Sequence, residues 1–237
     1  MNAPPTRREF LADVGRGMLL ATVGSGVAAE LGLVRAFAED TPEALTFGPL
    51  EPLVCLMQET PASRLLPALA DLLKSGTDLR RLVAAAALAN ARTFGGEDYV
   101  GFHTMMALAP ALHMARELPE ARQALPVFKV LYRNTNRIQE HGGRKDEVLH
   151  PVKPGVLSEG RPGGELLREA VRRQGAGDAE ASFAALAQRS VEDALNDLLF
   201  VVQDNTEVHR VVLPYRAWDL LDLIGRDHAH TLLRQSV

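Results

Sequence analysis

Helix signals recur along almost the whole of this 237-residue chain, and they constrain its fold more than any other feature. Asp78 precedes an alanine-rich run that ends at Gly95, which is the order of an N-cap residue, a helix and a glycine stop. Thr60 and Pro61 open a leucine-rich run that stops at Gly76 in the same way. No stretch alternates convincingly between apolar and polar residues, as a half-buried strand would. The pattern therefore predicts an all-α fold, built as a helical bundle or as stacked helix pairs.

The helix signals fall into two halves on either side of a loop. Residues 142–164 contain several glycines and three prolines without a helical period, which predicts a long connection. Further helices are expected at about 97–118, 120–141, 165–174, 178–188, 191–203, 207–224 and 227–237. The chain is long enough for one domain with a real core, and one domain is the working interpretation.

The chain contains a single cysteine, Cys55, so an intramolecular disulfide is impossible and the fold must be stabilised by packing. A buried, inert thiol is the simplest interpretation of this residue, with a metal ligand or an intermolecular bond as the alternatives. Hydrophobic residues make up 46% of the chain and charged residues 24%, as in ordinary water-soluble globular proteins.

The N-terminus carries a motif with a paired arginine, Thr6-Arg7-Arg8-Glu9-Phe10-Leu11. This segment resembles the twin-arginine (Tat) export signal, whose pattern is Ser or Thr, two arginines, any residue, Phe and Leu. The resemblance covers the signal alone and implies recognition by the Tat translocase. It also implies transport of a folded protein, and insertion of a cofactor before export is a common reason for using this pathway.

The residues after the motif support the same interpretation. Residues 14–34 are apolar, but glycines and the charged Arg16 and Glu30 dilute them, so they do not predict a transmembrane anchor. Ala36 and Ala38 then provide a small-x-small cleavage motif. We therefore expect residues 1–38 to be the signal peptide and residues 39–237 to be the mature domain, located in the bacterial periplasm or otherwise outside the cytoplasm.

The charge of the mature chain argues against nucleic acid as a partner. Removal of residues 1–38 takes away four basic and three acidic side chains, which leaves 22 basic against 27 acidic ones. A mildly acidic domain without a Lys/Arg block is unsuited to nucleic acid or to an anionic membrane surface.

An internal duplication is suggested by five identities between the two halves. When the chain is aligned with itself at an offset of 106 residues, both halves contain the pattern N-x3-F-x3-D-x4-H-x7-A. We therefore expect two half-repeats, at 78–141 and 165–237. The aligned pairs are Asn90 with Asn196, Phe94 with Phe200, Asp98 with Asp204, His103 with His209 and Ala111 with Ala217.

The aligned histidines are the candidate site. His103 and His209 each lie on or beside the apolar stripe of an expected helix, and a buried imidazole needs partners for its ring nitrogens. In one interpretation they converge and bind a metal ion or a non-covalent haem iron. In the other interpretation each histidine closes a structural hydrogen bond. The residues expected to orient the imidazoles as a second shell are Asp98, Asp204, Asn90 and Asn196.

Two functions follow, and the sequence leaves both open. The first is an exported all-α protein that binds a metal or haem and acts as an oxidoreductase. The second is a non-enzymatic helical-repeat protein that binds a partner or serves as a scaffold in the cell envelope. Whether the protein is an enzyme stays undecided, since H-E-x-x-H, P-loop, G-x-S-x-G and C-x-x-C-H motifs are all absent.

Overall fold

The computed structural model describes residues 44–173 and 176–237. The export and cleavage motifs lie outside these residues, so their roles stay predictions. The residues concerned are Arg7, Arg8, Phe10 and Leu11 in the export motif, and Ala36 and Ala38 in the cleavage motif.

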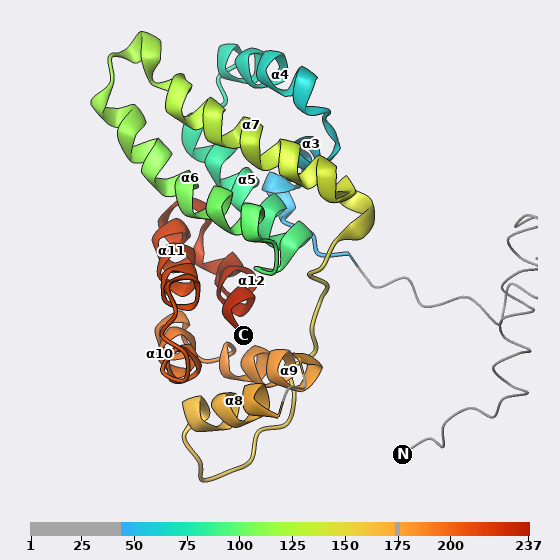
Figure 1. The fold of residues 1–237 in the computed structure, drawn as a ribbon, viewed down its shortest axis with the longest axis vertical. Coiled ribbons are helices and arrows are strands. Elements are labelled where there is room, and N and C mark those ends of the chain that lie inside the picture. The colour runs from blue at the N-terminus through green and yellow to red at the C-terminus, as the bar shows by residue number, and fades with distance from the viewer. Residues whose placement is uncertain (1–43, 174–175) are drawn as a thin grey trace, which may run out of the picture. The chain divides into compact units, whose positions relative to one another are not determined.

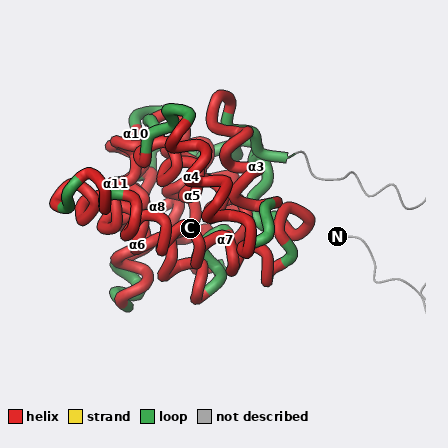
Figure 2. Tube along the Cα trace, turned by 90° about the horizontal axis from the view of Figure 1, so that it is seen from above, coloured by secondary structure: helices red, strands yellow, loops and turns green. Residues whose placement is uncertain are grey.

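Within the described residues the fold consists of ten α-helices and no strand, which confirms the predicted all-α class. The helices are α3 (Glu51–Glu59), α4 (Ala62–Lys74), α5 (Leu79–Phe94), α6 (Tyr99–Glu117), α7 (Ala124–His141), α8 (Gly163–Arg172), α9 (Ala176–Leu186), α10 (Val191–Val202), α11 (Val208–Ile224) and α12 (Ala229–Leu233). In Figure 2 the described residues are drawn as helices and loops, without a strand. No helix in this part of the chain is both long and apolar enough to cross a membrane.

Helix α5 is the centre of the fold (Figure 1). It begins as predicted, because the Asp78 side chain accepts a hydrogen bond from the Arg81 amide, and it ends at Gly95, whose φ of 57° closes the last turn. Every residue from Leu82 to Phe94 is buried. A helix that is buried on all sides needs neighbours all round, and α3, α6, α7, α11 and α12 provide them. The many alanines of α5 allow these helices to approach closely.

The remaining helices lie in two groups, one beside α5 and one beyond α11 and α12 (Figure 1). Helices α6 and α7 pack along each other, and α4 lies against α7. Helices α8, α9 and α10 pack on one another, while α11 and α12 connect them to α5. The long connection predicted at 142–164 contains a short 3₁₀ turn at Gly143–Asp146 and no other helix until α8 begins at Gly163.

Several helix boundaries differ from the sequence prediction. The leucine-rich helix starts one residue late, with Pro61 as its N-cap in place of Thr60. The expected terminal helix at 227–237 is only the five-residue α12 with a 3₁₀ turn on either side. Helix α3 was not predicted at all, although Pro52 lies in its first turn, where proline is well tolerated.

The two proposed half-repeats contain different helices. The segment 78–141 holds three helices of 16, 19 and 18 residues. The segment 165–237 holds most of α8 and four further helices, of which α12 has five residues. Asn90 is buried, whereas its aligned counterpart Asn196 is exposed. The helix lengths therefore give the internal duplication no support.

Candidate functional site

The structure brings the two aligned histidines side by side. His103 lies near the start of α6, His209 lies in the first turn of α11, and these two helices pack against each other. The centroids of the two imidazole rings are 5.5 Å apart, and the ring planes meet at 76°. Two residues that are 106 positions apart in the sequence thus form one pair.

Each imidazole uses its Nδ1 atom in a local hydrogen bond. His103 Nδ1 is 2.7 Å from the carbonyl oxygen of Tyr99, and His209 Nδ1 contacts the carboxylate of Glu207. The hydrogen bond from His209 lowers the pKa of Glu207, so this side chain is an acceptor at neutral pH. Since a carbonyl and a carboxylate can only accept, both Nδ1 atoms carry the proton. In the neutral rings each Nε2 atom therefore keeps its lone pair.

Two aromatic rings surround the imidazole pair. The ring centroid of Tyr99 is 4.5 Å from that of His103 and 5.6 Å from that of His209. The ring centroid of Phe102 is 5.3 Å from that of His103 and 4.6 Å from that of His209. Phe102 is buried, while Tyr99 is 69% exposed, so the cluster lies at the surface. His103 is likewise exposed and His209 is half-buried, in contrast to the buried positions expected for both.

A hollow lies on each side of the pair. His103 lines a groove of about 470 Å³ between α6 and α7, which also contains the cationic side chains of Lys129 and Arg133. His209 lines a smaller cavity of about 180 Å³ beside Arg210 and the C-terminal residues. The groove beside His103 falls within the size range of small-molecule sites, whereas the cavity beside His209 lies below it.

The predicted orienting role of the two aspartates is wrong. Asp98 is the N-cap of α6, where its carboxylate accepts from the Gly101 amide and forms a bidentate pair with Arg137. Asp204 pairs with two arginines of α8, Arg168 and Arg172, and their hydrogen bonds lower its pKa to about 2. Both carboxylates hold helices together, because a guanidinium is a stronger partner for them than a neutral imidazole.

The predicted role of the two asparagines also fails. The Asn90 side chain donates to the Gly101 carbonyl, to Thr104 and to Asn134, in a buried network that joins α5, α6 and α7. Asn196 is exposed on α10. Neither side chain forms a hydrogen bond with an imidazole of the pair. The acceptors that do so, the Tyr99 carbonyl and the Glu207 carboxylate, were not predicted from the sequence. Glu207 two residues before His209 was the available signal.

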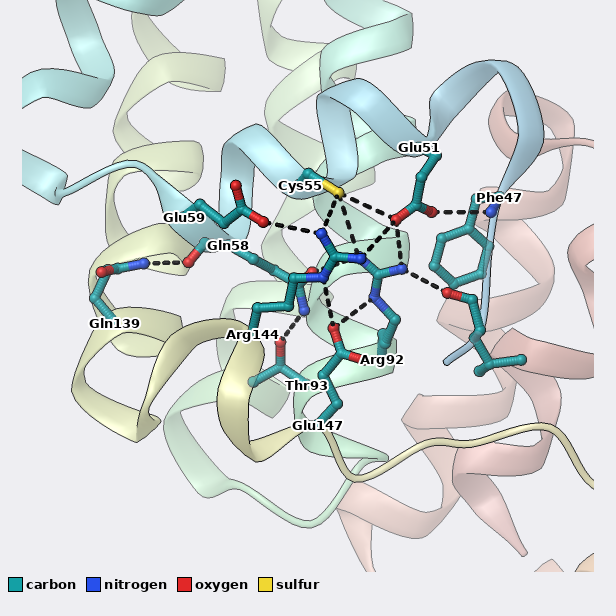
Figure 3. Close-up of polar contacts among 11 residues, drawn as sticks. Phe47, Glu51, Cys55, Gln58, Glu59, Arg92, Thr93, Gln139, Arg144 and Glu147 are labelled. Atoms are coloured by element: carbon teal, nitrogen blue, oxygen red, sulfur yellow. Dashed lines mark hydrogen bonds and ion pairs between the residues drawn. The ribbon is translucent and has the colours of Figure 1, made fainter. Parts of the chain in front are cut away.

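A second cluster of polar side chains, shown in Figure 3, surrounds Arg92 of α5. The guanidinium of Arg92 is fully buried, and its Nη1 atom donates to Glu51 Oε1 at 2.8 Å and to the Leu45 carbonyl at 2.6 Å. Its Nε atom is 3.0 Å from Glu147 Oε1, and Nη2 donates to Gln58. Arg92 therefore joins the segment before α3, α3 itself and the chain after α7 to the central helix.

Cys55 lies at the edge of this cluster. Its thiol contacts Glu51 Oε1 at 3.1 Å, and burial together with this hydrogen bond raises the pKa of the thiol. Arg144 Nη1 is 3.2 Å from the sulfur but does not reverse the shift. A thiol with a raised pKa is a poor nucleophile, as expected of an inert cysteine, but Cys55 is half-buried and not buried as predicted.

The chain was compared with protein-family models, with curated proteins and with solved structures, and none of them matches it. The functional argument therefore rests on the residues described above.

Proposed function

We propose that this chain is an exported protein that binds a divalent transition-metal ion between His103 and His209. The supporting observation is that both Nδ1–H groups point to oxygen acceptors while both Nε2 atoms keep a lone pair, in two rings that touch. Metal-binding histidines have this arrangement, since the hydrogen bond at one nitrogen holds the tautomer and the orientation of the other. Neutral imidazole suits zinc, copper and nickel in particular.

The pair leaves most of the coordination sphere open. In residues 44–173 and 176–237, no group of three His, Cys, Asp or Glu side chains is placed to hold a metal. A structural zinc site uses four protein ligands, whereas a site with fewer leaves positions for water or for an external ligand. With a redox-active ion such as copper, an open site would supply one-electron chemistry, which is how the predicted oxidoreductase function would arise.

A haem fits the pair less well than a single ion. Metal–nitrogen bonds near 2 Å would place two axial imidazole centroids roughly 6 Å apart with the flat macrocycle between them. The two imidazoles instead meet edge to face at 5.5 Å, and Tyr99 and Phe102 occupy the adjoining space. The residues present therefore do not fit a haem, and we restrict the proposal to a metal ion.

Export by the twin-arginine pathway is the second part of the proposal. It is supported by the motif of residues 6–11, by the diluted apolar segment after it and by the cleavage motif that ends at Ala38. A periplasmic location would give the imidazole pair, of which His103 is exposed, access to metal ions outside the cytoplasm.

Metal titration tests the binding site directly. The full chain, purified without a polyhistidine tag, is titrated with Cu²⁺ and Zn²⁺ by isothermal calorimetry, as are the variants His103→Ala and His209→Ala. We expect each variant to lose at least tenfold in affinity. His113→Ala is the matched control, because His113 is an exposed histidine of the same helix α6. Equal affinity in all four proteins would exclude the site.

One observation favours the non-enzymatic alternative, a binding or scaffold protein of the cell envelope. Val208, Val211 and Tyr215 of α11 are 67%, 42% and 60% exposed and share one face of the helix, since they are three and four residues apart. An exposed apolar row of this kind fits the apolar face of a partner helix. In that case Val211→Asp should prevent co-purification of an envelope partner, whereas the two histidine variants should retain it.

A further inference from the structure

Arg234 is a buried cation with too few partners. Its side chain is 2% exposed, and its one hydrogen bond is donated by Nη2 to the His150 carbonyl at 2.6 Å. The nearest carboxylate oxygen, Glu180 Oε1 of α9, is 3.9 Å from Nε, which is too far for a hydrogen bond. The Nε–H group thus has no hydrogen-bond partner among the described residues. Burial lowers the pKa of Arg234, and the attraction of Glu180 does not restore it.

Arg92 shows how closely a buried arginine of the same fold is paired with carboxylates, although its Nε atom, like that of Arg234, has no hydrogen bond of good geometry among the described residues. It is as deeply buried as Arg234, and it has two carboxylates within 3.0 Å as well as an amide and a carbonyl oxygen. A buried charge is unfavourable unless it is paired and hydrogen-bonded. The contrast between the two arginines indicates that Arg234 lacks a carboxylate within hydrogen-bond distance.

Arg234 lines a cavity of about 360 Å³, near the lower end of the size range of small-molecule sites. Gln235 lines it too, and its buried Oε1 atom has no hydrogen-bond donor among the described residues. Glu97 and Glu180 add two carboxylates to the same wall. The other lining residues are apolar or small, namely Gly95, Gly96, Val148, Leu149 and Val237.

We propose that this cavity binds a free α-amino acid. The ligand must bring an anionic acceptor for Arg234 and a cationic donor for Gln235 and the two glutamates, and a zwitterion brings both on adjacent atoms. Its carboxylate pairs with the guanidinium, its ammonium group faces Gln235 Oε1 and Glu180, and a small apolar side chain lies against Val148 and Leu149. A simple anion would pair with Arg234 but would be repelled by Glu97 and Glu180.

This site goes beyond the proposed metal function and does not depend on it. Neither His103 nor His209 lines the cavity. Amino-acid binding is therefore expected to persist in the His103→Ala, His209→Ala double variant, so that the failure of one proposal leaves the other intact.

Binding is measured on the full chain by calorimetry and by ligand-detected NMR, with L-alanine, L-valine and L-leucine as ligands. Acetate and methylammonium serve as the single-charge comparisons. We expect saturable binding of at least one amino acid and at least tenfold weaker binding of both single-charge compounds. Absence of amino-acid binding at 10 mM, or equal binding of acetate, would overturn the proposal and leave ordered water as the partner of Arg234.

The variants place the binding in this cavity. Arg234→Met should fold, because replacement of a poorly paired buried charge by an apolar side chain of similar volume is often neutral or stabilising. Its affinity for the amino acid should be at least tenfold lower. Arg210→Met is the control, because Arg210 is exposed and lines the neighbouring cavity, and this variant should bind the amino acid as the unchanged chain does. If Arg234→Met does not fold, Glu180→Gln replaces it and should weaken binding about tenfold. Unchanged affinity in the folded variant would refute the site.

Discussion

Replacement of Arg92 by methionine is expected to destabilise the fold more than any surface change. The substitution removes a fully buried guanidinium from two carboxylates, Glu51 at 20% and Glu147 at 7% side-chain exposure. Arg144, at 3.9 Å from Glu51 and 3.8 Å from Glu147, is then the cation that remains near both carboxylates. Breaking a buried ion pair from one side costs about 3–5 kcal/mol. For a domain of this size, about 2–4 °C of melting temperature per kcal/mol gives a decrease of roughly 6–20 °C.

Thermal and urea unfolding of the full chain, followed by circular dichroism, measures this loss. The matched control is Arg226→Met, since Arg226 pairs with Glu192 at the surface, where the two side chains are 59% and 53% exposed. An exposed pair contributes at most about 1 kcal/mol, so the control should unfold close to the unchanged chain. If Arg92→Met loses no more stability than the control does, the account of Arg92 as the link between segments is refuted.

A triple variant distinguishes two causes of the lost stability, the carboxylates that no longer face Arg92 and the packing of its side chain. Arg92→Met combined with Glu51→Gln and Glu147→Gln also removes the two carboxylates that the single substitution leaves with Arg144 alone, at 3.8–3.9 Å. Because an unpaired buried charge is the main cost, the triple variant should be more stable than Arg92→Met alone. A triple variant that is less stable than the single one would show that the loss comes from packing instead.

Two further predictions concern export and acid stability. Replacement of both Arg7 and Arg8 by lysine should abolish export, which fractionation of cells would show as retention in the cytoplasm. Burial lowers the pKa of His230 to about 4, and the charge of Arg234 adds to this effect. The folded state therefore favours neutral His230, and its contribution to stability, on the order of 3 kcal/mol, is present above pH 6.5 and declines as the pH falls towards 4. His230→Phe should show a smaller loss of unfolding free energy between pH 7 and 4.5 than the unchanged chain, and an identical loss in both would count against the assignment.

The local features of the fold could be predicted well. Asp78 and Gly95 mark the two ends of α5 in the sequence as in the structure, because a cap and a stop act on the few residues next to them. Helix α3 was missed since its start lacks a side-chain cap and only Pro52 marks it. The burial of Arg92 within α5 was equally invisible, because an arginine on an alanine-rich helix is normally expected to face solvent.

The candidate site could be predicted only in part. The shared spacing singled out His103 and His209, and the structure places their rings next to each other. Their orienting partners were assigned to Asp98 and Asp204, but these carboxylates bind arginines on α7 and α8. The sequence could not show this competition, since the competing guanidinium groups come from helices that are distant along the chain.

The sequence by itself determined the helical class, most of the helix ends and the inability to form an internal disulfide, because caps, glycine stops and a single cysteine act locally or by composition. It also supplied the twin-arginine motif on which the export proposal rests. The tertiary structure alone decided that His103 meets His209, that Arg92 has two carboxylates within 3.0 Å and that the nearest carboxylate to Arg234 is 3.9 Å away. Each of these depends on which helix faces which across the centre of α5, and that choice is made by the packing of all the helices together.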